Sequence, residues 1–292
     1  MSKYVVIGIL GIAIIVGYIF TNSREGADRS NLPPVQSHRS YQAVVLSDIR
    51  GLRPNQAVPI RYRIRNDRGE ILKNFSVVHE KIMHLIVVRK DLQYFQHLHP
   101  TFNQISGEFS ADITFPEDGP YRIFSDFTPA ASEDNPMQLP VTSFFDAAVG
   151  DNYGEIPVMV DKANKKTVED YEVTFLFPKQ ELLRSQTQIM YSLRIEKSGK
   201  PVESLEDYLG AKGHSVVLKK GTLDFIHTHA MEEGMDMEHM MDAMGGMEEM
   251  EKNEPSRIDF STTFPAPGIY KIFTQFQHNG KAKTTDYTLQ IQ

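Results

Sequence analysis

The sequence contains a long internal duplication. Residues His84–His99 align without a gap with His214–His229, 130 positions further along the chain. A second pair of stretches, Thr114–Phe124 and Thr263–Phe273, aligns at an offset of 149 because the second copy carries an insertion at roughly 230–255. A repeat of about 110 residues is far longer than a solenoid repeat. The duplication therefore predicts two related domains, each long enough to bury a core of its own.

Each copy has the pattern of short β-strands. Runs of β-branched and aromatic residues alternate with Gly, Pro and Asn, and no long amphipathic helix interrupts them. In the first copy the predicted strands are Tyr41–Leu46, Pro59–Arg65, His84–Arg89, Glu108–Phe115 and Tyr121–Phe127. This pattern is typical of an all-β sandwich.

A tyrosine near the end of each copy narrows the fold further. Tyr121 and Tyr270 lie in the matching segments Asp-Gly-Pro-Tyr-Arg-Ile and Pro-Gly-Ile-Tyr-Lys-Ile. Immunoglobulin-type sandwiches carry such a tyrosine, whose hydroxyl bonds to upstream backbone two residues before a conserved cysteine. Ile123 and Ile272 take the cysteine position here and should pack in the core. We therefore expect two tandem immunoglobulin-like β-sandwich domains.

The N-terminus predicts a membrane anchor. Residues Tyr4–Phe20 form a run of 17 residues without a charge, and no good cleavage site follows. This length fits an uncleaved transmembrane helix, with a cleaved signal peptide as the alternative. The soluble part is then extracytoplasmic, in the periplasm or on the cell surface. The predicted organisation is an anchor at 1–21, a linker at 22–40, a first domain at 41–150, a linker at 151–170, and a second domain at 171–292 that contains the insertion.

Composition excludes several classes of function. The chain has no cysteine, which rules out disulfides, zinc–thiolate sites, iron–sulfur clusters and blue-copper sites. A net charge of −7 without a basic stripe argues against nucleic-acid binding. No acid/base pair, nucleophile elbow or phosphate loop is visible, so we expect a binding protein rather than an enzyme.

Histidines recur at matched positions in the two copies. Residues 84–99 read as a β-hairpin centred between Lys90 and Asp91, and the same holds 130 positions later. This centre predicts that His84 faces His97 with His99 on the same side, and correspondingly His214, His227 and His229. Three imidazoles at one end of each hairpin would suit copper or zinc.

A structural role for these histidines is the alternative. Ile86, Val88 and Phe95 are predicted to share the face of the hairpin that carries the histidines. If that face is the core side, each histidine would bond to nearby backbone instead of a metal. The sequence leaves both interpretations open.

Several segments resemble a family of bacterial exported proteins. They are Leu205–Leu218 (LEDYLGAKGHSVVL), Asp224–His229 (DFIHTH) and Phe264–Phe273 (FPAPGIYKIF), together with the His-Leu-His-Pro at 97–100. They are similar to immunoglobulin-like, YtkA-like domains, and the resemblance implies an immunoglobulin-like fold and copper or heavy-metal handling. Two positions depart from the family pattern: Ala230 replaces a proline and Met83 replaces a glycine.

The insertion in the second copy is rich in methionine. It holds eight of the chain's thirteen methionines and one histidine, namely Met231, Met235, Met237, His239, Met240, Met241, Met244, Met247 and Met250. Thioether sulfur is a soft ligand that selects Cu(I). The spacing of four of these methionines also fits one stripe of a short helix that packs on the sandwich.

These observations predict a membrane-anchored extracytoplasmic protein that sequesters or transfers Cu(I), with zinc or silver as other candidate metals. The expected partners are the metal ion, the membrane through the N-terminal helix, and another envelope or metal-transport protein. The alternative is a non-catalytic scaffold of an envelope complex with structural histidines.

Overall fold

The computed structural model describes residues 41–131, 139–151, 154, 156–231 and 255–292. The predicted anchor, the linker at 22–40 and most of the methionine-rich insertion lie outside these residues. Within them, no helix is both long enough and apolar enough to cross a membrane. All of the described residues belong to one compact unit.

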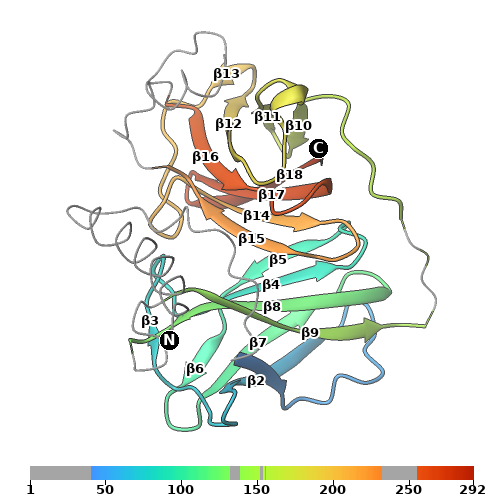
Figure 1. Cartoon of the computed structure of the whole chain (residues 1–292), viewed down its shortest axis with the longest axis vertical. Helices are drawn as coiled ribbons and strands as arrows, with labels where there is room; N and C mark the ends of the chain where they lie inside the picture. Colours follow the sequence, from blue (N-terminus) through green and yellow to red (C-terminus); the bar gives the residue numbers. More distant parts are fainter. Residues whose placement is uncertain (1–40, 132–138, 152–153, 155, 232–254) are drawn as a thin grey trace, which may run out of the picture. The chain divides into compact units, whose positions relative to one another are not determined.

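The first half of this unit is a two-sheet antiparallel sandwich (Figure 1). One sheet has the strand order β1-β2-β7-β6; the other has the order β3-β8-β4-β5, and β9 pairs with β8. The strands are β1 (Tyr41–Val45), β2 (Ala57–Asn66), β3 (Phe75–Ser76), β4 (His84–Arg89), β5 (Phe95–Leu98), β6 (Thr101–Asn103), β7 (Glu108–Thr114), β8 (Gly119–Pro129) and β9 (Val141–Val149). The five strands predicted in this copy are all present, with ends within two residues of the prediction.

The second half repeats this arrangement. Its sheets have the orders β10-β11-β12-β13, with β16 on β12, and β15-β14-β17-β18. The strands are β10 (Lys165–Val168), β11 (Tyr171–Leu176), β12 (Gln188–Lys197), β13 (Lys200–Pro201), β14 (Gly213–Lys219), β15 (Phe225–His229), β16 (Arg257–Thr263), β17 (Gly268–His278) and β18 (Lys281–Ile291). A short 3-10 helix, η2, covers Gln180–Leu182. The prediction of an all-β chain is confirmed for the described residues.

Each sandwich has its own core between its two sheets. Ile123 and Ile272 are fully buried in these cores, as expected for residues at the position that a cysteine takes in immunoglobulin-type domains. The hydroxyl of Tyr121 donates to the Glu117 carbonyl at 2.9 Å, and that of Tyr270 donates to the Ala266 carbonyl at 2.7 Å. Both predicted tyrosine corners are therefore present.

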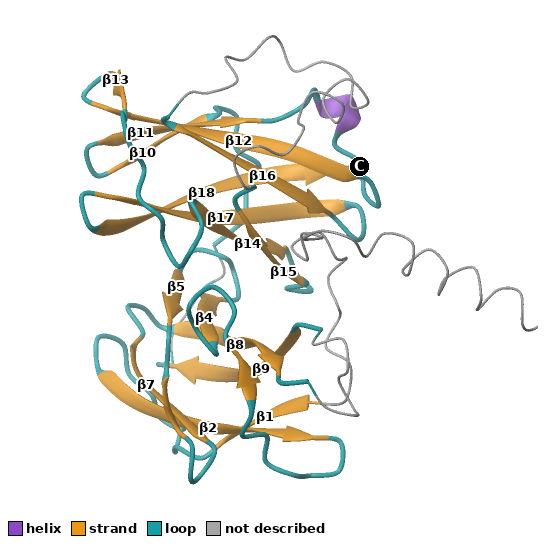
Figure 2. Ribbon diagram, turned by 90° about the vertical axis from the view of Figure 1, so that its left-hand side faces the viewer, coloured by secondary structure: helices purple, strands orange, loops and turns teal. Residues whose placement is uncertain are grey.

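The two sandwiches also bury apolar surface against each other. All six residues of β4 are buried, because alternate side chains point into two different clusters. Leu85 and Val87 belong to the core of the first sandwich, whereas Ile86 and Val88 belong to a third cluster shared with the second sandwich. We call this third cluster, with the histidines beside it, the inter-sandwich interface. The face that carries the histidines is thus an outer face of the sheet, covered by the other sandwich (Figure 2).

Aromatic pairs cross this interface in a reciprocal way. Phe95 stacks on Phe273 with ring centroids 4.6 Å apart, and Phe225 packs on Phe124 at 4.9 Å. In the sequence repeat, Phe95 matches Phe225 and Phe124 matches Phe273. The contact therefore has the reciprocity of a two-fold dimer interface, although it lies within one chain.

The predicted hairpin register is wrong by two residues. Ile86 pairs with His97, and Leu85 pairs with Leu98, so His84 does not face His97. In the second copy His214 faces His229 instead of His227. The turn in the first copy is wider than predicted, because Leu92 adopts φ 61° and its amide N–H donates to the Arg89 carbonyl at 2.8 Å. A shift of two residues keeps every side chain on its original face, so the histidines still converge.

Candidate metal centre

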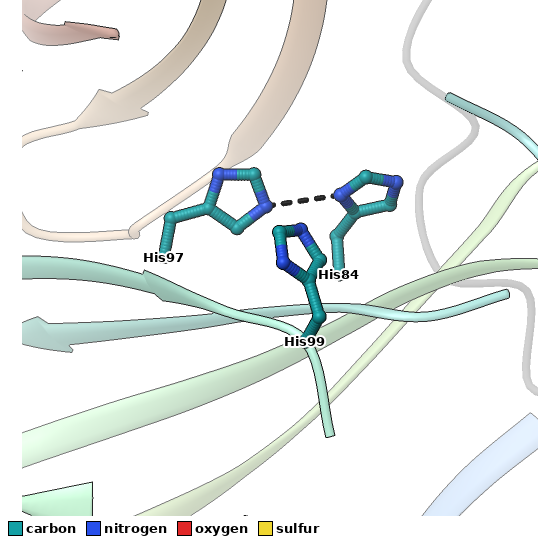
Figure 3. Close-up of side chains that lie close together, drawn as sticks. All are labelled: His84, His97 and His99. Carbon is teal, nitrogen blue, oxygen red and sulfur yellow. Dashed lines mark hydrogen bonds between the residues drawn. The ribbon is translucent and has the colours of Figure 1, made fainter. Parts of the chain in front are cut away.

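The six matched histidines form two triads. In each triad, one ring nitrogen from each histidine lies within 4.8 Å of the other two, and the members are His84, His97 and His99 in the first triad and His214, His227 and His229 in the second. Figure 3 shows the first triad, in which the three rings turn toward one another from β4 and from the end of β5. The predicted convergence of three imidazoles in each copy is confirmed.

Hydrogen bonds fix the tautomers of two rings in the second triad. His214 Nε2 lies 2.7 Å from the Tyr208 carbonyl, and His227 Nδ1 lies 2.8 Å from Asp126 Oδ2. Both oxygens only accept, so each of these nitrogens carries the hydrogen. The opposite nitrogens, His214 Nδ1 and His227 Nε2, are buried and have no hydrogen-bond partner among the described residues, and the same is true of both nitrogens of His229. The arrangement leaves a lone pair of each ring available to a shared cation.

The first triad has matching outer hydrogen bonds, but its two inner nitrogens contact each other. His84 Nε2 donates to the Val78 carbonyl at 3.2 Å, and His97 Nδ1 lies 2.7 Å from Gln275 Oε1. The remaining nitrogens, His84 Nδ1 and His97 Nε2, are only 3.0 Å apart (Figure 3). When the two outer nitrogens donate to their oxygens, the two inner nitrogens of the neutral rings turn lone pairs toward each other. A cation between these lone pairs would remove the repulsion between them.

Burial keeps five of the six triad histidines in the form that binds metals. It lowers the pKa of His84 and His97 to about 3, that of His99 to about 4 and that of His214 to about 2. Burial also lowers the pKa of His229 well below its ordinary value. Neighbouring imidazoles add to the effect in every case. Neutral imidazole is the metal-ligating form, so these rings need lose no proton to bind a metal at neutral pH.

The two triads lie next to each other at the inter-sandwich interface. The ring centroid of His84 is 5.4 Å from that of His227 and 6.4 Å from that of His214. The sequence predicted one triad for each domain but did not predict that they meet. The one sequence signal for the inter-sandwich interface was that the predicted strand His84–Arg89 has apolar residues on both faces.

Three residues near the triads were missed by the sequence analysis. Asp126 and Gln275 each bond to a histidine of the other sandwich, and the ring of His79 stacks on that of His229 at 3.5 Å. Asp126 and Gln275 occupy matching positions of the duplication, two residues after Phe124 and Phe273. That match was available in the sequence, but nothing there indicated that their side chains cross to the other copy.

The methionine-rich insertion is described only at its edge. Met231 lies two residues after His229, and its backbone N–H donates to the Asp259 carbonyl at 2.8 Å. The other predicted ligands of the insertion lie outside the described residues, namely Met235, Met237, His239, Met240, Met241, Met244, Met247 and Met250.

Fold and site define the chain as an all-β sandwich protein with two histidine clusters that could hold metal ions. Residues 39–140 and 166–292 match the family model described as "Domain of unknown function (DUF8832)". The chain belongs to this family. No curated protein matches the sequence.

Similarities to solved structures are remote. A DUF4426 family protein from Pseudomonas aeruginosa is 14% identical, with 44% of this chain and 94% of that chain covered and a TM-score of 0.30. Salmonella alpha-2-macroglobulin is 12% identical, with 92% of this chain and 16% of that chain covered and a TM-score of 0.28. The activated alpha-2-macroglobulin of Escherichia coli is 13% identical, with 86% and 20% covered and a TM-score of 0.27. The chain thus spans a fifth or less of these macroglobulins.

Proposed function

We propose that the protein is an extracytoplasmic metal-binding protein whose two histidine triads hold transition-metal ions, with copper as the favoured metal. One observation carries the proposal: in each triad two rings use their outer nitrogens in hydrogen bonds, and one ring nitrogen from each of the three histidines lies within 4.8 Å of the others. A purely structural histidine in a buried site has its ring nitrogens satisfied by neighbours. His229, with two unpartnered buried nitrogens among the described residues, is the opposite case.

The ligand set restricts the metal. Three imidazoles and no thiolate suit copper or zinc, and carboxylate-preferring ions such as Mg²⁺ and Ca²⁺ are poor fits. The methionine-rich insertion begins directly after His229 and supplies soft thioether ligands, which favours Cu(I), with silver as a chemical analogue. This insertion would present an ion to the triads or receive one from them.

The wider setting follows from the sequence. The segment Tyr4–Phe20 would anchor the protein in the membrane, and the immunoglobulin-like tandem would face the periplasm or the cell surface. The similarity to YtkA-like domains supports metal handling. Sequestration of copper, or its transfer to another envelope or metal-transport protein, requires no catalytic step. We therefore propose a binding role rather than an enzymatic one.

A copper titration tests this function. The purified full chain would compete for Cu(I) with a chromophoric chelator, beside His99→Ala, His229→Ala, the double variant, and a variant that lacks residues 232–254. Each alanine is expected to remove one tightly bound ion, and the deletion is expected to remove only ions beyond those two. If the double variant binds as many Cu(I) ions as the wild type, the triads are structural, and a metal-independent scaffold becomes the better account.

A further inference from the structure

The two triads differ in the side chain that is hydrogen-bonded to one of their histidines. Asp126 and Gln275 occupy equivalent places, since Asp126 pairs with His84 across β8 and β4 and Gln275 pairs with His214 across β17 and β14. Each side chain reaches past its own triad to a histidine of the other sandwich. Asp126 accepts from His227, and Gln275 accepts from His97. The first sandwich therefore orients a ligand of the second triad, and the second sandwich orients a ligand of the first.

A threonine on the next strand holds each of these side chains. The Thr142 hydroxyl donates to Asp126 Oδ1 at 2.9 Å, which leaves Oδ2 for His227. Gln275 Nε2 donates to the Thr284 hydroxyl at 3.1 Å, which leaves Oε1 for His97. Thr142 pairs with Asp126, and Thr284 pairs with Gln275, in the same register of the two sheets. The two networks share their geometry and differ mainly in charge.

That charge difference is located at the second triad. Asp126 is an acidic residue, and its Oδ2 accepts from His227 at 2.8 Å. Gln275 has no charge in any state. A carboxylate behind a ligating histidine raises the basicity of the ring and offsets the charge of a bound cation in a buried site. A dipositive ion gains more from this than a monopositive one.

His79 adds a second difference. It lies in the loop before β4 of the first sandwich, yet its ring stacks on His229 and lies edge-on to His214 at 5.3 Å. The matching residue of the second copy is Leu209, and both residues have positive φ, 49° and 55°. Each follows the residue whose carbonyl accepts from the first histidine of its own triad, Val78 or Tyr208. The chain therefore places an extra imidazole of the first sandwich beside the second triad, whereas the matching position of the second sandwich holds a leucine.

We propose that His214, His227 and His229, with Asp126 hydrogen-bonded to His227 and the ring of His79 stacked on His229, form a site for a divalent cation such as Zn(II) or Cu(II). The first triad, backed by the neutral Gln275, is the site for monovalent Cu(I). The inference rests on the proposed metal-binding function and assigns a different ion to each triad. Where the divalent ion is Cu(II), such a protein holds both oxidation states of copper at adjacent sites.

The two sites can be separated with a matched pair of variants. His99→Ala leaves only the second triad intact, and His229→Ala leaves only the first. Zn(II) and Cu(I) affinities of both full-length variants would be measured by chelator competition. We expect the second triad to bind Zn(II) about 10–100-fold more tightly than the first, the range typical for groups behind a metal ligand. The difference for Cu(I) is expected to be much smaller or reversed.

Exchanging the groups that are hydrogen-bonded to the ligands tests whether Asp126 and Gln275 cause the difference in Zn(II) affinity. In the His99→Ala background, Asp126→Asn should remove most of the Zn(II) preference, and His79→Leu should weaken Zn(II) binding while thermal unfolding shows a folded protein. In the His229→Ala background, Gln275→Glu should raise Zn(II) affinity at the first triad. Gln275→Glu leaves the Asp126 carboxylate in place. It therefore tests the effect of the carboxylate on Zn(II) affinity even if Asp126→Asn fails to fold.

The outcomes separate this inference from the function on which it rests. If both triads bind Zn(II) and Cu(I) tightly with the same relative affinities, and Gln275→Glu does not change these affinities, the assignment of different ions is wrong. The metal-binding function would then still hold. If the wild-type protein binds no metal, both the metal-binding function and the assignment of different ions are rejected.

Discussion

Asp126 Oδ2 lies 2.8 Å from His227 Nδ1, although the two residues are 101 positions apart and belong to different sandwiches. The equivalent pair, Gln275 and His97, is separated by 178 positions and bonded at 2.7 Å. Such reciprocity is the rule at the interface of a two-fold dimer. In this chain it places ligand-orienting groups of one half behind the metal ligands of the other, so binding at the triads should depend on the contact between the halves.

The aromatic stack at the interface should support both stability and metal binding. Phe273→Ala removes the ring that packs on Phe95 and leaves a cavity in the inter-sandwich cluster. We expect the free energy of unfolding to fall by about 3 kcal/mol and metal affinity to weaken at both triads. Urea denaturation and chelator competition would measure the two effects. Ile105→Ala, at an isoleucine that is 87% exposed, is the control and should change neither. If metal affinity is unchanged in a destabilised Phe273→Ala protein, metal binding does not depend on the packing of the interface.

The two tyrosine corners should contribute equally. Tyr121→Phe and Tyr270→Phe each delete one hydroxyl that donates to a backbone carbonyl and leave the buried ring in place. Each should lower the free energy of unfolding by about 1 kcal/mol, with metal binding unchanged. Equilibrium denaturation of the two variants would show this. A variant as stable as the wild type would mean that the corner is dispensable in that sandwich.

The metal-free protein should lose stability in mild acid. Burial lowers the folded-state pKa of His84, His97, His99 and His214 to values between about 2 and 4, whereas the ordinary value is 6.5. Below about pH 6.5 the unfolded chain binds protons that the folded chain does not, so the free energy of unfolding falls as pH falls. Each such histidine contributes up to about 1.4 kcal/mol per pH unit.

Urea melts of the chelator-treated protein at about pH 7.5, 6.5 and 5.5 would measure this dependence. His84→Gln, which keeps a donor for the Val78 carbonyl, should make the decline with falling pH shallower. Stability that stays constant or rises over this range would contradict the buried neutral state of His84, His97, His99 and His214.

The sequence was sufficient to predict the strands and the histidine convergence, for identifiable reasons. Alternation of apolar residues defines the strands, and the duplication shows which residues of one copy correspond to those of the other. The predicted face for His84, His97 and His99 was correct despite an error of two residues in register, because side chains alternate with period two. The width of the turn, set by the positive φ of Leu92, was not predictable from a residue type that rarely adopts it.

The meeting of the two triads could not be predicted from local patterns. It depends on which outer faces of two sandwiches pack together, and apolar residues such as Ile86 and Phe95 look the same whether they face a core or a partner surface. The roles of Asp126 and His79 follow from that packing and were missed for the same reason. The predicted anchor and most of the methionine-rich insertion lie outside the described residues and stay predictions.

X-ray absorption of the zinc-loaded full chain tests the central claim most directly. At a zinc concentration that fills both triads, the spectrum should show a shell of imidazole nitrogens at about 2.0–2.1 Å, and His99→Ala with His229→Ala together should remove that shell. Zinc surrounded by oxygen ligands alone, or a nitrogen shell that survives in the double variant, would contradict the assignment of the triads as metal sites.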